Sequence, residues 1–286
     1  MITYRASLDV PFTTCATVSG WLAAHRRAVD VRPWQRAATC WVQAVLVLRW
    51  FKDGTALWLL ACDACISQAT AYRYLHEALD VIAQHVPDLH EVLAEGREQG
   101  WSHVCLDGTL VPTDRSAEKS PDTGYDLWYS GKHKRHGANV QVLTDPTGYP
   151  VWVSPAEPGS THDITAARTH VLPALYRAAA AGLPTLTDKG YTGAGIGTKI
   201  PHKGHDLHPD DQTYNHLITD LRAPAERANA LLKNTFRALT RISLDPYRTT
   251  QIVAAALVLL HLQRGLRTSG GDHGVSPPAA RSMRRR

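Results

Sequence analysis

The chain has 286 residues, of which 44% are apolar and 20% charged, and its formal net charge at pH 7 is +5. This length and composition are those of a globular protein with one large domain or two, and they exclude a chain that is disordered throughout. The mild basic excess permits a nucleic-acid partner without requiring one.

Neither a secretory signal nor a membrane span is expected. Residues 1–11 contain tyrosine, arginine and aspartate and have no sustained apolar core. The most apolar runs, residues 41–51 and 252–262, are about half the length that a membrane span needs and predict buried helices. Five cysteines, an odd number, indicate reduced thiols in a cytoplasm.

Residues 12–100 are expected to be almost wholly helical and to form an N-terminal region over residues 1–100. A helix beginning at Pro33 is predicted to end at Gly54. The Cys62-Asp-Ala-Cys65 motif falls within a helical pattern. Structural packing is favoured over a zinc or redox site for this motif, because no second close pair of Cys or His completes a zinc set.

Two helices, predicted over residues 56–65 and 68–84 with Thr55 and Ser67 as caps, are only a few residues apart. This is the spacing of a helix-turn-helix, at about residues 55–84. An ordinary helical hairpin is the alternative, and it is favoured if this segment is considered alone. The polar residues predicted to face outward, suited to base edges and phosphates, are Ser67, Gln68, Thr70 and Arg73.

Asp107 is the first of three acids that suggest a metal site. Residues 104–106 and 110–111 are apolar and β-branched, which predicts buried strands with Asp107 at the end of the first. An acid on a buried strand is costly unless it is paired or metal-bound.

Residues 127–130, 138–144 and 149–154 are predicted to form three consecutive strands joined by turns. Residues 132–136, between the first two, are the densest basic cluster of the chain body. This cluster is either a contact to a DNA backbone or a charged hairpin tip. Its candidate DNA-binding side chains are Lys132, Lys134 and Arg135.

Asp163 stands at the start of a helix predicted over residues 163–181, with a break or kink at Pro173. There it is expected to satisfy free backbone N–H groups and to complement the helix dipole. His162 is its expected hydrogen-bonding neighbour, or a DNA contact. Asp163 is also the main rival for the second catalytic acid.

Asp188 follows a short apolar run, residues 183–187, that Gly190 closes, which predicts a buried strand ending at a loop. Glu226 is predicted to lie in the first turn of a helix that begins at Pro224. Lys233, seven residues later, shares the helix face of Glu226. Both Lys233 and Arg222 are expected either to contact phosphate or to balance Glu226.

These segments resemble the DDE transposases of the insertion-sequence 5 group, close to the Harbinger-like branch. The resemblance covers roughly residues 55–263. The residues that carry it are Asp107-Gly-Thr109, Pro158-Gly-Ser-Thr-His-Asp163, Asp188-Lys-Gly-Tyr191, Arg222, Glu226 and Lys233.

The resemblance implies an α/β fold class, with a ribonuclease-H-like catalytic domain over residues 101–266 preceded by the all-α helix-turn-helix region. Asp107 would bridge two Mg²⁺ ions, with Mn²⁺ as an alternative, and Asp188 and Glu226 would complete one ion each. The implied activity is cleavage at the ends of an insertion sequence followed by strand transfer into target DNA.

The implied partner is double-stranded DNA, bound at element ends and target by a dimer or larger assembly in a bacterial cytoplasm, near the nucleoid. Two alternatives remain open: a nuclease of the same fold without strand transfer, and a noncatalytic helix-turn-helix DNA-binding protein. From Arg264 onward, six arginines and a single acid give a surplus equal to the whole formal net charge. Residues 267–286 are therefore predicted to be a disordered basic tail that adds nonspecific DNA affinity.

Overall fold

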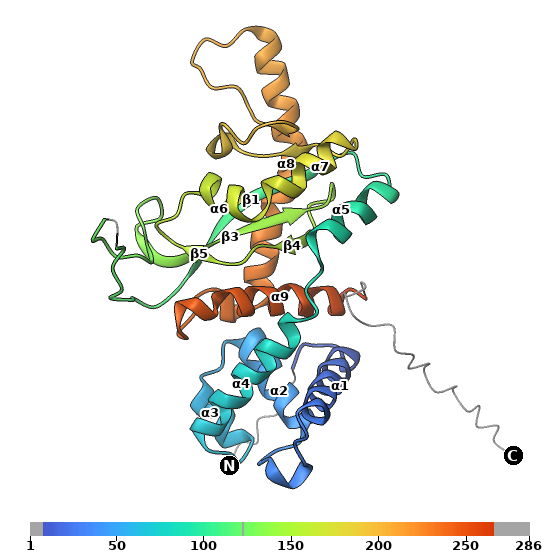
Figure 1. The fold of residues 1–286 in the computed structure, drawn as a ribbon, viewed down its shortest axis with the longest axis vertical. Coiled ribbons are helices and arrows are strands. Elements are labelled where there is room, and N and C mark those ends of the chain that lie inside the picture. The colour runs from blue at the N-terminus through green and yellow to red at the C-terminus, as the bar shows by residue number, and fades with distance from the viewer. Residues whose placement is uncertain (1–7, 122, 266–286) are drawn as a thin grey trace, which may run out of the picture.

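The structure is a computed structural model, and it describes residues 8–121 and 123–265. The predicted basic tail, residues 267–286, lies outside the described residues. A group of N-terminal helices lies below a mixed β-sheet, and one long helix, α9, runs between them (Figure 1). The fold is therefore mixed α/β, with the first helices gathered at one end of the molecule.

The N-terminal region is helical, as predicted. Pro33 begins only a short 3₁₀ turn, Pro33–Gln35, so the predicted start of the next helix is wrong. That helix begins after Thr39, whose side chain accepts a hydrogen bond from the Val42 N–H, and it ends at Gly54 with φ +63°, as expected. The helices are α1 (Phe12–Ala28), α2 (Cys40–Asp53), α3 (Leu57–Asp63), α4 (Gln68–Ala83) and α5 (Leu89–Glu98).

The strands form a seven-stranded sheet in the described residues. The path of neighbouring strands is β2-β3-β1-β6-β7, and β4 and β5 also pair with β3. β1 is antiparallel to β3 and parallel to β6, which is itself parallel to β7. The strands are β1 (Val104–Pro112), β2 (Tyr129–Ser130), β3 (Arg135–Thr144), β4 (Pro150–Val153), β5 (Glu157–Pro158), β6 (Thr185–Leu186) and β7 (Thr198–Lys199).

β1 differs from its prediction in one respect that matters for the site. The two predicted short strands are one continuous strand, because every residue from Cys105 to Pro112 pairs with β3. Asp107 therefore lies inside the strand, opposite Val142, and not at its end. β6 pairs with β1 only at Val104 and Cys105, so in the described part of the chain the edge of β1 beyond them has no strand on that side.

Successive residues of β1 and β3 point to opposite faces of the sheet, and each face has its own core. Leu106 and Leu143 pack with residues of α5, α6 (Asp163–His170) and α7 (Leu172–Ala180). Val111, Val140 and Val142 pack with the N-terminal helices, α8 (Pro209–Thr235) and α9 (Thr249–Gln263). We call these the α6 face and the α8 face.

α8 overturns one prediction. It is a 27-residue helix with Pro224 in its interior, so Glu226 lies well within the helix and not in a first turn. The proline that occupies the first position is Pro209, after a cap in which the His208 side chain accepts from the Asp210 N–H. α8 crosses its face of the sheet and projects beyond it (Figure 1).

Other helical predictions hold. Residues 252–262 lie in α9 and are almost all buried, and the helix predicted from Asp163 breaks near Pro173 into α6 and α7. No helix in the described ranges is both long and apolar enough to cross a membrane. All five cysteines are described and free, and Cys62 and Cys65 are exposed, so the predicted packing of that pair is wrong.

Candidate active site

Asp107 and Asp188 come together on the α8 face. The parallel register places Cys105 of β1 beside Leu186 of β6, and each aspartate stands two residues further along its extended chain. Two residues further is the same face, so the carboxylates lie at neighbouring positions. Burial raises the pKa of Asp107 to about 6, and the negative charge of Asp188 is the next largest cause.

One oxygen of each of these carboxylates accepts a hydrogen bond from the protein. Oδ2 of Asp107 accepts from Nδ2 of Asn229 at 2.8 Å, and Oδ1 of Asp188 accepts from the Gly190 N–H at 2.8 Å. Within the described residues, the second oxygen of each has no hydrogen-bonding partner, and Oδ1 of Asn229 is buried without one. Carboxylate and amide oxygens that accept few hydrogen bonds from the protein are suited to binding a hard divalent cation.

α8 presents a row of functional side chains to β1. Arg222 and Asn229 are seven residues apart and Lys233 follows four later, which puts all three on one side of the helix. The Arg222 charge lowers the pKa of Asp107. Lys233 donates from Nζ to Oγ1 of Thr109 at 2.8 Å and to the Leu110 carbonyl at 2.9 Å. Lys233 therefore holds α8 against β1 and is not free in this structure to bind a phosphate.

Glu226 belongs to the same row by its spacing, four residues after Arg222 and three before Asn229. Its side chain is exposed and, in the part of the chain that is described, has no hydrogen bond or ion pair. Within those ranges no group of three His, Cys, Asp or Glu side chains is placed to hold a metal ion. Two of the three predicted acids are thus adjacent, and Glu226 lies on the helix beside them.

Asp163 lies on the α6 face, across the sheet from the pair. A Cβ at Gly108 would be 2.5 Å from Oδ1 of Asp163, so the aspartate sits directly on β1 where glycine leaves room. Oδ1 accepts from Nδ2 of Asn139 at 2.8 Å, and Oδ2 pairs with Nζ of Lys132 at 2.9 Å. The predicted capping bonds are wrong, because these two partners take the carboxylate, although Asp163 does lie in the first turn of α6.

A buried polar chain connects Asp163 to the turn that carries Asp188. Nε2 of Gln141 donates to Oδ1 of Asn139 at 3.1 Å, and the Tyr191 hydroxyl donates to Oε1 of Gln141 at 2.6 Å. Sequence reasoning missed Asn139, Gln141 and Asn229. A signal was present for the first two, since they are polar residues at alternate positions of the otherwise apolar run 138–143.

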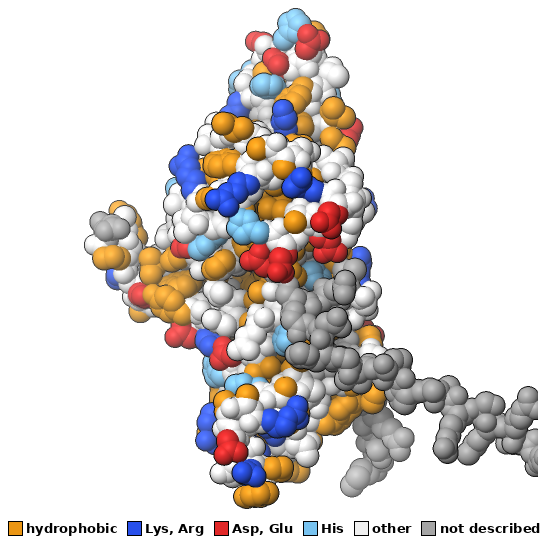
Figure 2. All heavy atoms as spheres, turned by 45° about the vertical axis from the view of Figure 1, so that its right-hand side comes forward, with side chains coloured by type: hydrophobic (Ala, Val, Ile, Leu, Met, Phe, Trp, Pro, Cys, Tyr) orange, Lys and Arg blue, Asp and Glu red, His pale blue; other side chains and the backbone are white. Residues whose placement is uncertain are grey.

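Predicted DNA-binding residues are exposed at the β2–β3 turn and at the start of α4. Lys132, Lys134 and Arg135 are exposed at the β2–β3 turn, where Lys134 has a φ of +54°. On the face in Figure 2, basic side chains are interspersed with acidic ones and form no continuous band. On this face, any DNA contact therefore depends on local groups of residues.

α3 and α4 are joined by a short turn, and both helices bury apolar side chains. Ser67 caps α4 by accepting from the Thr70 N–H, as predicted, whereas Thr55 does not cap α3. Gln68 and Arg73 are exposed, and Arg73 donates to Oγ1 of Thr70 at 3.0 Å. The buried side chains of the two helices include Leu57, Leu60, Ala61, Ala71, Tyr74 and Leu75. The Tyr74 hydroxyl accepts from the Ala38 N–H, which lies outside this pair of helices.

Comparison with known proteins adds a family. The sequence profile described as DDE superfamily endonuclease matches residues 106–261, which is more than half of the chain and includes Asp107, Asp188 and Glu226. The chain belongs to this family. DDE superfamily endonucleases are generally dependent on a divalent metal ion, in keeping with the carboxylate pair.

No curated protein matches the chain. Among solved structures, it is similar to the Mos1 transposase paired-end complex with left transposon end. The two share 15% sequence identity over 78% of each chain, with a TM-score of 0.22.

Proposed function

We propose that this DDE superfamily endonuclease is a transposase of the insertion-sequence 5 group, close to the Harbinger-like branch. It binds the ends of its own element and catalyses metal-dependent DNA cleavage and strand transfer in a ribonuclease-H-like domain. The observation that supports this most directly is the adjacent pair Asp107 and Asp188 within the matched segment, with the pKa of Asp107 raised to about 6.

The residues that would hold two Mg²⁺ ions, or Mn²⁺, are Asp107, Asp188 and Glu226. Bound ions would activate the attacking oxygen and stabilise the leaving oxygen of the phosphodiester. Glu226 is preferred to Asp163 for two reasons. It is on the helix that packs against the α8 face, and its oxygens have no partner in the described residues, whereas both oxygens of Asp163 are engaged.

The surrounding residues position these acids. Asn229 orients Asp107 through Oδ2, and the Gly190 N–H orients Asp188 through Oδ1. A Cβ at Gly190 would be 2.9 Å from that same Asp188 oxygen, so a glycine at this position leaves the carboxylate room. Arg222 contributes a positive charge beside Asp107, suited to a phosphate that carries developing negative charge.

Double-stranded DNA is the proposed partner. The exposed start of α4, with Gln68 and Arg73, would enter the major groove as the second helix of a helix-turn-helix. Lys134 and Arg135 would contact the DNA backbone nearer the acids. Pairing two element ends for transfer would need a dimer or larger assembly.

The deciding experiment uses DNA that carries the ends of the element. We expect cleavage to 3′-hydroxyl ends and joined products with Mg²⁺, neither product with EDTA, and neither with Asp188→Asn, which should still bind DNA. Full activity of Asp188→Asn would remove Asp188 from the metal set. Cleavage without any joined product would instead identify a nuclease of the same fold.

The third acid is tested by a matched pair of variants. Glu226→Gln should abolish cleavage and leave folding intact, since its side chain is exposed. Asp163→Asn should lower stability and retain cleavage, because its contacts are to Asn139 and Lys132. The reverse result, with active Glu226→Gln and well-folded but inactive Asp163→Asn, would exchange the two roles.

A further inference from the structure

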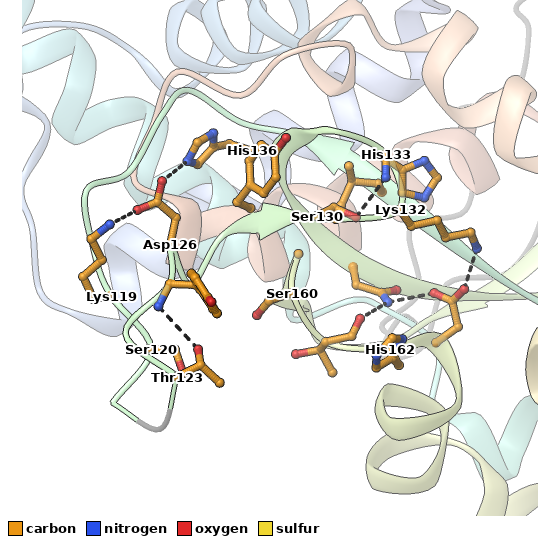
Figure 3. Close-up of a pocket in the computed structure, with 18 residues that line it drawn as sticks. Lys119, Ser120, Thr123, Asp126, Ser130, Lys132, His133, His136, Ser160 and His162 are labelled. Atoms are coloured by element: carbon orange, nitrogen blue, oxygen red, sulfur yellow. Dashed lines mark hydrogen bonds and ion pairs between the residues drawn. The ribbon is translucent and has the colours of Figure 1, made fainter.

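A pocket of about 700 Å³ opens on the α6 face, and the proposed cleavage chemistry does not use it. One wall is a hairpin in which Lys119 pairs with Asp126, and another is the 159–163 loop before α6. Figure 3 shows Lys119 and Asp126 on one side of the pocket, Ser130 and Lys132 on another, and His162 facing them from below.

The hairpin wall is fixed to the body of the protein. Glu118 accepts from Nε1 of Trp128 at 2.9 Å and from the Tyr247 hydroxyl at 2.6 Å. Trp128 is fully buried, and Asp114, nearer β1, pairs with Arg241 at 2.6 Å. The pocket is therefore largely formed before any ligand arrives, as ligand sites usually are.

The lining is close to neutral. Among the described residues of the lining, the two acids are each paired with a lysine, Asp126 with Lys119 and Asp163 with Lys132. No lysine or arginine among those same residues is left without an acidic partner, so they offer a phosphate group no free lysine or arginine. Other polar groups of the lining include the hydroxyls of Ser120, Thr123 and Ser160 and the imidazoles of His133, His136 and His162. Neutral donors and acceptors of this kind suit the hydrogen-bonding edge of an uncharged ring.

Two tyrosines give the pocket its planar surfaces. Tyr125 is 79% exposed and Tyr129 is 38% exposed, and both line the pocket. The Tyr129 ring meets His136 edge-on, with centroids 5.3 Å apart, and Nε2 of His136 is 3.5 Å from Asp126. The contact with His136 thus holds the Tyr129 ring in place. A fixed aromatic ring that is partly open to solvent is a stacking surface for another planar ring.

The pocket adjoins the carboxylate pair around the open edge of β1. Asp163, at one end of the pocket, sits on Gly108, the residue after Asp107. The charges of both Asp188 and Asp107 reach Lys132 of the lining. A DNA strand with a phosphate at the carboxylates would therefore have its next nucleotides beside the pocket opening.

We propose that this pocket binds one unpaired nucleobase of the DNA strand, extruded from the duplex stack beside the bond to be cut. The base stacks on Tyr129, and the neutral polar groups of the lining contact its edge. This inference rests on the proposed function, because it requires DNA at the carboxylate pair.

The test compares three 20-base-pair DNAs: a blunt duplex, the same duplex with one bulged adenine, and the same with an abasic bulge. Binding is measured by fluorescence anisotropy at one fixed salt concentration, in the Asp188→Asn background so that no DNA is cut. We expect the adenine bulge to bind about tenfold more tightly than the other two DNAs. That advantage should disappear in Tyr129→Ala and persist in Tyr129→Phe.

Two further variants distinguish a loss of base binding from a loss of folding. Tyr125→Ala changes an exposed residue and should also reduce the preference for the bulge. Tyr176→Ala changes a tyrosine of similar exposure to Tyr129, 36%, on α7 outside the pocket, and should leave the preference unchanged.

Other outcomes overturn the inference. Equal loss of affinity for all three DNAs in Tyr129→Ala would show a backbone or structural role, and an unchanged preference would show that the base binds elsewhere. If wild-type protein cleaves its element ends but has no preference for the bulge, the pocket proposal fails and the proposed function stands. If it neither binds nor cleaves DNA, both fail.

Discussion

Gly148 lies at the turn between β3 and β4 with a φ of +82°, and a Cβ there would overlap the carbonyl of Pro224 in α8. Gly148→Ala should therefore lower the free energy of unfolding by more than the roughly 1–2 kcal/mol of left-handed strain. Gly182→Ala is the control, since Gly182 has a φ of +94° with no atom within 4 Å of a Cβ. Urea denaturation measures the free energy of unfolding of both variants. An equal decrease in the two would show that α8 shifts to accept the added methyl group without a loss of stability.

Tyr191 is a second single-residue test, because its hydroxyl is buried and donates to Gln141. Tyr191→Phe leaves Oε1 of Gln141 without this donor, which should lower the free energy of unfolding by about 1–3 kcal/mol. Tyr214→Phe is the control, because the Tyr214 hydroxyl makes no hydrogen bond within the described residues. Equal stability of Tyr191→Phe and wild type would show that water replaces the hydroxyl.

Single residues of the site differ in how well the sequence alone identifies them. Asp107 and Asp188 are recognisable because each follows an apolar run, and two such strands can place their acids side by side. Asn229 is not, since its contact to Asp107 joins residues 122 positions apart. The partners of Asp163 are 24 and 31 residues away, so local pattern predicted a helix cap in their place.

At the scale of elements, α8 offers a direct test of interior proline. Pro224 cannot donate to the carbonyl four residues earlier, a deficit of about 3 kcal/mol relative to alanine in a helix interior. Pro224→Ala should raise the free energy of unfolding by up to that amount. Pro209→Ala, at the first position of the same helix, should change it little. A loss of stability in Pro224→Ala would mean that the proline shapes the contact with Gly148.

A helix could be predicted from the sequence where its capping residue and its pattern of apolar residues indicate the same start. Ser67 and the apolar positions after it define α4, and an uninterrupted apolar run defines α9. The start of α8 is ambiguous in the sequence, because Pro209 and Pro224 each satisfy the rule for a helix start. Only the structure shows that the helix begins at Pro209 and continues through Pro224. Similarly, Pro33 resembles a helix start, yet the capped helix begins after Thr39.

At the scale of the whole molecule, one core extends from the N-terminal helices into the sheet. It contains buried residues of α1, α2 and α4 together with residues of β3, β4, α8 and α9. A fragment of residues 101–265 should therefore unfold without a cooperative transition, since it would expose the side of α9 that packs on α4. Calorimetry of the fragment beside the full chain measures this, and a sharp transition in the fragment would show that residues 101–265 fold alone.

Two buried histidines should make this shared structure sensitive to acid. His261 of α9 lies 2.9 Å from the Pro150 carbonyl through Nε2, and burial lowers its pKa below the ordinary 6.5. Burial also lowers the pKa of His103, although its contact with the Leu221 backbone acts in the opposite direction. The unfolded chain therefore binds protons more readily than the folded one.

The stability that these histidines contribute is thus present above about pH 6.5 and is lost as the pH falls through their lowered folded-state values, by at most about 1.4 kcal/mol per pH unit for each group. His261→Gln should flatten the dependence of the unfolding free energy on pH between about 5 and 7. His90→Gln, which changes an exposed histidine of α5, should leave that dependence unchanged. Urea denaturation across this pH range measures both variants. A slope in His261→Gln as steep as that of wild type would assign the acid sensitivity to other groups, with His103 the next to replace.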